Sequence, residues 1–552
     1  MPEARPPIHR PTPLVAVFPA AAAAVAALLV VSPISTSAQL LPVGDSWEEY
    51  VRVLAAAGVA SVGGYAVRPF TVERVLAGVS DSVPHPWSDR LLPPPARLIG
   101  GGASLLLSDP GTRFFLNTSR PFGQNEGGVW AGRGITAALD AGATLSWGPV
   151  TVTLHPTITF AQNRDFELAP VSLGGMPRYA YPWRWIDLPQ RFGPDPLWVV
   201  DPGQSSLRLR IGGAVAGFGT ESLWWGPGIR NGILMSNNAP GFPHALLGTS
   251  RPVSIGIGTL EAQWVWGRLE QSDWFDTTFV DPGRYITGAV VSISPDWLSG
   301  LHLGISRVFY EWIPEDGLPF GEHFLVFHGV RKEAFTSPDN PGGEDERSQM
   351  FSAFFRWVLP SSGFELWAEW ARNDHGWNFR DYFLEPEHAA GRTLGLRKVL
   401  TLSGNRLLSL ETELTNIQRS STVAVRPAPT YYAHHLVLQG YTERGQVIGA
   451  AVGPGGSAQY LGFHLYSGWG KMGAFVERRV VDNDAYYASV EDAPDWCCHN
   501  GLVDIGGELL TVRGEVELSV AGTGTLELNR YFQKNSDHWN LNLRLEARWR
   551  PR

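Results

Sequence analysis

The last segment of the chain, His538 to Arg550, alternates strictly between apolar and polar side chains. Its apolar series is Leu541, Leu543, Leu545, Ala547 and Trp549, and its polar series is Asn540, Asn542, Arg544, Glu546 and Arg548. Successive side chains of a β-strand point to opposite faces of the sheet, so this period of two predicts a strand with one apolar and one charged face. Residues 408–414 and 515–520 alternate in the same way.

Eighteen segments have this strand-like pattern from about Gly111 onward. They lie near residues 112–120, 133–146, 150–161, 205–216, 219–225, 250–257, 260–270, 286–295, 300–310, 349–358, 363–372, 392–402, 406–417, 458–467, 471–481, 501–512, 515–529 and 539–549. An even number of antiparallel strands returns the chain to the side on which it started. Residues 431–438 also resemble a strand. Counting them as one extra strand would place the short turns that follow on the outer side of the membrane instead of the periplasmic side. We therefore interpret residues 418–457 as one long outer excursion.

A soluble β-sandwich would alternate in the same way, with its charged face toward water. Two features favour a membrane barrel. Many strands reach about 10 residues, which is enough to cross a bilayer when tilted. Short turns, such as Trp147-Gly148-Pro149 and Gly217-Phe218-Gly219, alternate with long irregular connections. Bacterial outer-membrane barrels have short periplasmic turns and long outer loops, so the sequence predicts an all-β, transmembrane antiparallel β-barrel of about 18 strands.

The chain divides into three regions by composition. Residues 1–38 have a positive start, an apolar run and the small residues Thr36-Ser37-Ala38, which is the pattern of a secretory signal peptide. Residues 39–110 are predicted to form a small periplasmic helical element and a Pro-rich connector that includes Pro93-Pro94-Pro95. Residues 111–552 are predicted to form the barrel, with long outer loops that fold toward its lumen.

Charge and cysteine content narrow the classes of partner. The formal net charge is −9 and the chain has no basic block, which excludes a nucleic-acid partner. The only cysteines, Cys497 and Cys498, are adjacent. They could form a vicinal disulfide, remain as two surface thiols or be an incidental loop feature. Their spacing with His499 fits no standard zinc pattern, so we expect no metal and no cofactor.

Two outer loops have an unusual mixture of aromatic, apolar and amide residues. LWWGPGIRNGILMSNNAPGFP (Leu223 to Pro243) is too polar for a core and too rich in Trp, Leu and Met for a solvated loop. A loop folded into the lumen would be packed on one side and wet on the other, and a barrel of this size has room for it. GYTERGQVIGAAVGPG (Gly440 to Gly455) has the same character. The residues assigned to the first lumen loop are Trp224, Trp225, Gly226, Pro227, Gly228, Asn237 and Asn238.

Several long motifs resemble the Wzi family of capsule assembly proteins. They are WWGPG followed by LMSNNAPGFP, FELWAEWARND (Phe364 to Asp374), EPEHAAGRTLGL (Glu385 to Leu396), ETELTN (Glu411 to Asn416) and GYTERGQVIGAAVGPG. The resemblance spans most of the mature chain. It implies an outer-membrane barrel of eighteen strands with a helical periplasmic element, acting as a lectin that holds polysaccharide at the cell surface.

A polysaccharide would need aromatic rings for the C–H faces of its sugars and polar groups for its hydroxyls, and the outer loops contain both. The candidate glycan-binding residues are Trp183, Trp185, Trp274, Trp377, Tyr382, Tyr431, Tyr432, His434, Tyr486 and Tyr487. The competing interpretation of each is packing within a loop or membership of the aromatic girdle at the membrane interface.

The sequence therefore predicts a non-catalytic outer-membrane lectin that anchors capsular or extracellular polysaccharide. Its expected partners are that polysaccharide, outer-membrane lipid and the barrel assembly machinery, and the barrel is expected to be a monomer. An enzyme is not indicated, because no G-x-S-x-G motif occurs. Glu365 and Glu369 share one strand face, but about 13–14 Å of extended chain would separate them, which exceeds the carboxylate spacing of glycoside hydrolases.

The alternative function is an outer-membrane channel or transporter for sugars or other small solutes. A wide barrel permits a channel. Long loops that fold inside the barrel argue against an open pore.

Overall fold

The computed structural model describes residues 39–61, 63–80, 82–169, 179–183, 186–275, 283–329, 347–373, 376–489 and 496–550. The predicted signal peptide, residues 1–38, and the candidate residue Trp185 lie outside the described residues.

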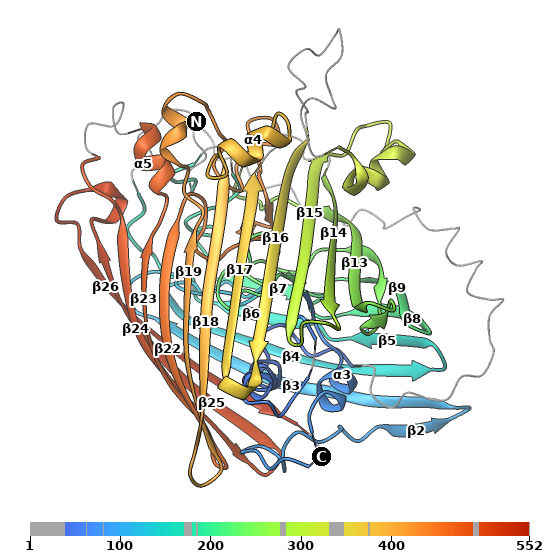
Figure 1. Cartoon of the computed structure of the whole chain (residues 1–552). Coiled ribbons are helices and arrows are strands. Elements are labelled where there is room, and N and C mark those ends of the chain that lie inside the picture. The colour runs from blue at the N-terminus through green and yellow to red at the C-terminus, as the bar shows by residue number, and fades with distance from the viewer. Residues whose placement is uncertain are drawn as a thin grey trace.

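The structure is a closed, antiparallel β-barrel of 18 strands, as the sequence predicted (Figure 1). Three of these strands are interrupted and carry two labels each: β5 (Val150–Leu154) with β6 (Thr157–Ala161), β7 (Leu197–Asp201) with β8 (Ser206–Ile211), and β11 (His244–Thr249) with β12 (Val253–Ser254). The others are β3 (Ala103–Asn117), β4 (Gly134–Trp147), β9 (Ala214–Gly219), β13 (Gly258–Leu269), β14 (Arg284–Pro295), β15 (Leu301–Trp312), β16 (Ser348–Leu359), β17 (Phe364–Asn373), β18 (Ala390–Leu402), β19 (Arg406–Asn416), β22 (Ser457–Ser467), β23 (Gly470–Val480), β24 (Gly501–Arg513), β25 (Val516–Leu528) and β26 (His538–Trp549). β26 pairs with β3 and closes the barrel.

The strand positions differ from prediction mainly in the first part of the barrel. The strand expected at 205–216 starts at Leu197 and ends at Ile211, the one expected at 219–225 is β9 at Ala214–Gly219, and the one expected at 250–257 starts at His244 and ends at Ser254. The first strand begins at Ala103, so the sheet starts before residue 111, and the short strand β2 (Arg97–Gly100) pairs with it. The predicted turn at Gly217-Phe218-Gly219 is wrong, because the β8–β9 turn lies at Gly212-Gly213 and Gly212 takes a φ of +59° there. Gly217 lies instead within the sheet, where a Cβ would be 2.5 Å from the carbonyl oxygen of Leu207.

The apolar face of the strands is the exposed face. On β26, Leu541, Leu543 and Leu545 are 43%, 39% and 51% exposed. Asn540 and Asn542 of the same strand are buried and point toward the lumen side. A soluble sandwich would bury the leucines and expose the polar residues. The opposite arrangement is that of a barrel whose outer wall contacts lipid.

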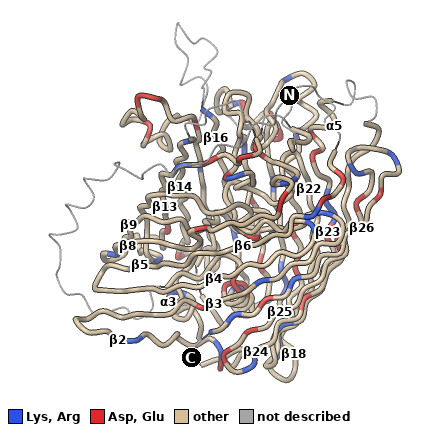
Figure 2. The backbone as a smooth tube through the Cα atoms, turned by 180° about the vertical axis from the view of Figure 1, so that it is seen from behind, with Lys and Arg blue, Asp and Glu red and all other residues tan. Residues whose placement is uncertain are grey.

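The inner wall therefore carries the charges of the strands. Glu365, Glu369, Arg397, Glu411 and Glu413 are all buried in the interior of the structure. Figure 2 shows charged residues along the length of the strands as well as in the loops. These charges need partners inside the barrel, because burying an unpaired charge is costly.

The N-terminal element lies inside the end of the barrel that carries the short turns (Figure 1). It contains α2 (Ser46–Ala56), β1 (Val67–Arg68) and α3 (Val72–Ala77). α2 begins at Asp45, whose carboxylate accepts a hydrogen bond from the N–H of Trp47 at 2.9 Å. α3 begins at Thr71, whose hydroxyl accepts from the N–H of Arg74 at 3.2 Å. Such caps satisfy amides that have no partner within the helix.

The remaining helices are short and lie in connections between strands. They are η1 (Phe320–Phe327), η3 (Pro360–Ser362), α4 (Phe379–Leu384), η4 (Ser421–Ala424), α5 (Asn483–Ser489) and η5 (Arg530–Phe532). Among the described residues, no helix combines the length and the apolar character needed to cross a membrane.

The outward orientation of the apolar face can be tested on one strand. Val520 lies near the middle of β25 and Leu528 at its outer end, and both are exposed on the outer wall. We expect Val520→Arg to lower the free energy of unfolding by about 2–4 kcal/mol, because the cation would sit near the bilayer midplane. Leu528→Arg should cost only about 0–1 kcal/mol, because it lies near the interface. Urea unfolding in lipid vesicles measures both, and equal costs would contradict this placement.

Candidate functional site: the filled lumen and the outer loops

The first lumen loop, residues 220–243, joins β9 to β11 and folds into the barrel. Trp224 and Trp225 are 3% and 0% exposed. The indole N–H of Trp225 donates to Oε1 of Gln263 on β13 at 2.8 Å, which fixes the loop to the wall. The guanidinium of Arg68 lies over the Trp224 ring, 4.5 Å from its centroid. Both tryptophans are thus packed inside the lumen and are out of reach of an external ligand.

The Gly226-Pro227-Gly228 turn of this loop contacts the N-terminal element. Arg52 donates to the carbonyl of Pro227 at 2.7 Å, and Arg68 donates to the carbonyl of Gly228 at 3.1 Å. Gly226 has a φ of +87°, and a Cβ there would lie 3.1 Å from the Glu369 carboxylate. Glycine is required at this position because other residues rarely adopt such a φ.

The second lumen loop, residues 417–456, lies against the first. It contains β20 (Thr442–Glu443) and β21 (Gln446–Val447). The side chain of Asn238 donates to the carbonyl of Val447 at 3.0 Å, and that of Asn237 donates to the carbonyls of Val43 and Asn125 at 3.1 and 2.9 Å. The two asparagines therefore satisfy backbone groups of neighbouring segments.

The inner wall holds the first lumen loop through the carboxylate of Glu413. Its oxygens accept hydrogen bonds from three consecutive backbone N–H groups, those of Ile229, Arg230 and Asn231, at 2.7, 3.0 and 2.9 Å. The indole N–H of Trp367 donates to the same carboxylate at 3.0 Å. Hydrogen bonds to an ionised acceptor are stronger than neutral ones, so this carboxylate is a strong anchor for the loop.

Ion pairs hold the N-terminal element to the inner wall of the barrel. Arg52 of α2 contacts Glu365 of β17 at 2.7 Å, and Arg74 of α3 contacts Glu261 of β13. Beyond β26, Arg550 contacts Asp45 at 2.9 Å.

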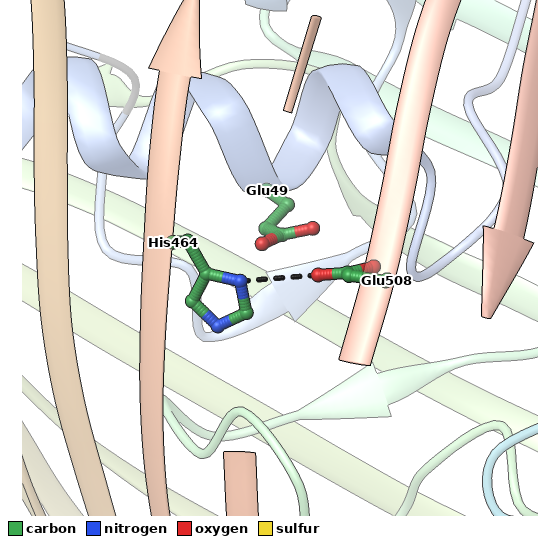
Figure 3. A group of neighbouring side chains, drawn as sticks. All are labelled: Glu49, His464 and Glu508. Atoms are coloured by element: carbon green, nitrogen blue, oxygen red, sulfur yellow. Dashed lines mark ion pairs between the residues drawn. The ribbon is translucent and has the colours of Figure 1, made fainter. Parts of the chain in front are cut away.

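A further ion-pair cluster joins α2 to the wall at Glu49, His464 and Glu508 (Figure 3). The carboxylate and imidazole atoms lie close enough together to suggest a metal site. However, Lys471 Nζ is 2.7 Å from both Glu49 and Glu508 and supplies the positive charge itself. The Tyr466 hydroxyl also donates to Glu49, at 2.8 Å. We interpret the cluster as a fastening of the N-terminal helix.

The two sets of insertions meet in the lumen. β1 of the N-terminal element pairs with β10 (Trp224–Trp225) of the first lumen loop, with Val67 opposite Trp225 and Arg68 opposite Trp224. The lumen is thus occupied from both ends by segments that hydrogen-bond to each other.

Three predicted glycan-binding residues help to hold the second lumen loop. Tyr431 and Tyr432 are 2% and 1% exposed. The Tyr432 hydroxyl donates to the carbonyl of Ile233 and accepts from the N–H of Ala450, both at 2.8 Å. His434 is partly buried, and its Nδ1 accepts from the N–H of Val437 at 3.1 Å. The two tyrosines are therefore unavailable to a polysaccharide, which corrects their assignment as candidates.

Trp183 and Trp274 are partly buried between outer loops. The indole N–H of Trp183 donates to Asp482 at 3.1 Å. Trp274 packs edge-on against Tyr179, with 5.3 Å between ring centroids.

The remaining candidates lie on the outer surface. Trp377 and Tyr487 are 42% and 64% exposed. Tyr382 is partly buried, with the guanidinium of Arg372 4.6 Å from its ring centroid. Tyr486 is partly buried and neighbours Tyr487, with 5.4 Å between ring centroids.

The aromatic cluster that surrounds Tyr486 was not predicted from sequence. Trp496 and Phe532 are 7% and 1% exposed and lie 4.4 Å apart by ring centroids. Cys497 and Cys498 form a vicinal disulfide next to them. The adjacent cysteines were a usable signal for a structured loop, but Phe532 belongs to another connection and could not be linked to them by spacing.

Comparison with known proteins agrees with this architecture. Residues 200–469 match the family model described as capsule assembly protein Wzi. The solved structure of Wzi from Escherichia coli, described as an outer membrane protein involved in group 1 capsule assembly and a carbohydrate-binding β-barrel, has a TM-score of 0.60 at 14% identity. The match covers 92% of this chain and 99% of that chain.

Other solved structures match less well. OccAB3 of Acinetobacter baumannii has a TM-score of 0.41 at 9% identity, covering 81% of this chain and 98% of that chain. A BenF-like porin from Pseudomonas fluorescens Pf-5 has a TM-score of 0.39 at 8% identity, with coverage of 81% and 98%. No curated protein matches the chain.

The closed barrel, its lipid-facing apolar wall and its occupied lumen define a bacterial outer-membrane β-barrel whose interior is filled by its own loops and N-terminal element. Within this class, residues 200–469, just under half of the chain, match the Wzi family of capsule assembly proteins. The fold is shared with the solved structure of Wzi from Escherichia coli.

The role of Glu413 as a loop anchor can be tested by amide exchange. Glu413→Ala would leave the N–H groups of Ile229, Arg230 and Asn231 without an acceptor, and unsatisfied buried donors are costly. We expect these three amides to exchange with deuterium about tenfold faster or more. Ser409→Ala, on the same strand and facing the same way, is the matched control because Ser409 has no hydrogen bond to the loop. Unchanged exchange in Glu413→Ala would show that the loop is held by other contacts.

The contact between Asp482 and Trp183 predicts a pH dependence of the outer loops. Burial raises the pKa of the Asp482 carboxyl to about 7, although the hydrogen bond from Trp183 lowers it. The unfolded carboxyl has a pKa of about 3.9. The folded loops therefore favour the protonated form, and their stability should fall as pH rises from about 4 to about 7.

We expect proteases to cleave these loops faster at pH 8 than at pH 6, after correction for protease activity. Asp482→Asn keeps an oxygen acceptor for Trp183 and removes the charge, so it should slow cleavage at pH 8 and flatten the pH dependence. Asp537→Asn removes an exposed outer-loop carboxylate and controls for net charge. An unchanged pH profile in Asp482→Asn would contradict the assignment.

Proposed function

We propose that this protein is an outer-membrane lectin that anchors capsular or extracellular polysaccharide to the cell surface. The match of residues 200–469 to the Wzi family and the fold shared with a carbohydrate-binding barrel support this proposal. The observation that carries it is the occupied lumen. A barrel whose interior is held by its own loops leaves its outer surface as the place to bind a large external polymer.

We also propose that the protein has no catalytic activity. Glu365 contacts Arg52, Arg356 and Arg397 at 2.7, 2.7 and 2.6 Å. A carboxylate engaged by three guanidinium groups is not free to act as a general acid or base. Tyr431 and Tyr432, which neighbour His434 in the second lumen loop, are buried.

The partners follow from the same proposal. The polysaccharide contacts the outer loops, outer-membrane lipid contacts the apolar wall, and the barrel assembly machinery inserts the chain. The barrel acts as a monomer, because a closed sheet leaves no edge strand to pair with a second copy.

Retention of polysaccharide by cells tests the anchoring role. Cells that lack the protein should produce normal amounts of polysaccharide but release most of it into the medium, and expression of the wild-type protein should restore retention. Total and cell-bound polysaccharide are measured after gentle washing. Unchanged retention would overturn the proposal.

Conductance distinguishes a lectin from a channel. In planar bilayers the wild-type protein should be nearly silent, because the lumen is occupied. A variant that lacks residues 229–238 of the first lumen loop should conduct, which shows that the barrel was inserted. Stable wild-type conductance of porin size would favour the channel.

A further inference from the structure

We propose that Tyr487, His499 and the Cys497–Cys498 disulfide form a platform that binds one pyranose ring of the polysaccharide. We call these four residues the sugar platform. The proposal rests on the proposed function and specifies where on the outer surface the polymer is held. It is built from the described residues 481–489 and 496–500 of the connection between β23 and β24 and from residues 529–537 between β25 and β26.

The sugar platform has a rigid base. The backbone N–H groups of Cys497 and Cys498 both donate to the carbonyl of Phe532, at 2.9 and 3.3 Å. The Tyr486 hydroxyl donates to the carbonyl of Cys497 at 3.0 Å. Beneath them Trp496 packs on Phe532. A ring bound here would meet a surface that is already ordered, so little conformational entropy is lost on binding.

The groups above this base are exposed and lie close together. Tyr487 is 64% exposed, and Cys497 and His499 are also exposed. The His499 ring lies 5.4 Å from the Tyr487 ring and 4.5 Å from the Tyr486 ring by centroid. Tyr487 and the neighbouring His499 ring, which directly follows the disulfide in the chain, offer a compact surface with apolar faces and polar tips, which suits the C–H face of a pyranose.

His499 also provides a directed polar group. Its Nδ1 lies 2.6 Å from the side-chain oxygen of Asn483. That oxygen can only accept, so Nδ1 carries the proton and Nε2 is the acceptor in the neutral ring. Nε2 makes no hydrogen bond with the part of the chain that the structure describes. It is available to accept a hydrogen bond from a sugar hydroxyl.

The outer loops also expose apolar side chains on α4. Phe379, Phe383 and Leu384 are 57%, 84% and 67% exposed. The side chain of Phe383 carries no polar group that could orient a sugar hydroxyl. Phe383 therefore serves as a matched control, because it is an exposed outer-loop aromatic outside the sugar platform.

Binding to purified protein tests the sugar platform. Full-length wild type, Tyr487→Ala, Tyr487→Trp and Phe383→Ala are immobilised in detergent. The probe is the polysaccharide that the source bacterium releases into its medium, fragmented to short chains. We expect Tyr487→Ala to weaken binding about tenfold, as for loss of one stacking contact. Tyr487→Trp should retain binding, because it keeps an aromatic face, and Phe383→Ala should match the wild type. Heat-dependent mobility on gels confirms that each variant is folded.

The outcomes separate this proposal from the proposed function. If wild type and Tyr487→Ala bind equally, or if Phe383→Ala loses as much as Tyr487→Ala, the sugar platform is wrong while the lectin function stands. If the wild-type protein binds no polysaccharide, and cells that lack the protein still retain their polysaccharide, the lectin function fails as well. Cys497→Ser/Cys498→Ser opens the disulfide and should also weaken binding, and full binding by this variant would overturn the role of the disulfide.

Discussion

The carboxylate of Glu365 joins the barrel wall to the N-terminal element, which fills the end of the barrel that carries the short turns. It contacts Arg356 and Arg397 on the two neighbouring strands and Arg52 on α2. Glu365 is fully buried, and a buried charge that loses its partner is strongly destabilising. The wall and the N-terminal element therefore depend on each other, since without α2 the wall would lose one of the three cations around this carboxylate.

The same dependence follows from the surroundings of the barrel. The hydrocarbon core of the bilayer forms no hydrogen bonds, so the strands direct their apolar side chains outward and their polar side chains inward. The inward groups then need partners in the lumen. Lys471 forms an ion pair with Glu49 on α2, and Glu413 accepts hydrogen bonds from three backbone N–H groups of the first lumen loop. The filled lumen is thus a consequence of the charged inner wall.

The strands could be predicted from sequence because their period of two and their short turns are local signals. The turn after β8 was misplaced because both Gly212-Gly213 and Gly217-Phe218-Gly219 have the composition of a turn. Only the pairing of β8 with β9 shows that the turn lies at Gly212-Gly213. Burial of Tyr432 could not be predicted, because its hydroxyl binds Ile233, 199 residues away in sequence. The Trp496–Phe532 cluster was missed for the same reason, since it forms between separate loops.

A polymer ligand makes a different demand on a protein than a small molecule does. A long polysaccharide presents many copies of the same ring, so weak contacts at single rings add up when several barrels hold one chain. Such retention needs no deep pocket, but it needs surfaces that do not move away from the ligand. The second lumen loop holds the connection after β23 in this way, because the N–H of Asn483 donates to the carbonyl of Gly455 at 3.1 Å and the N–H of Arg419 donates to the Asp484 carboxylate at 2.9 Å. In the proposed lectin, the segments that fill the lumen therefore also steady the surface on which a polymer would be held.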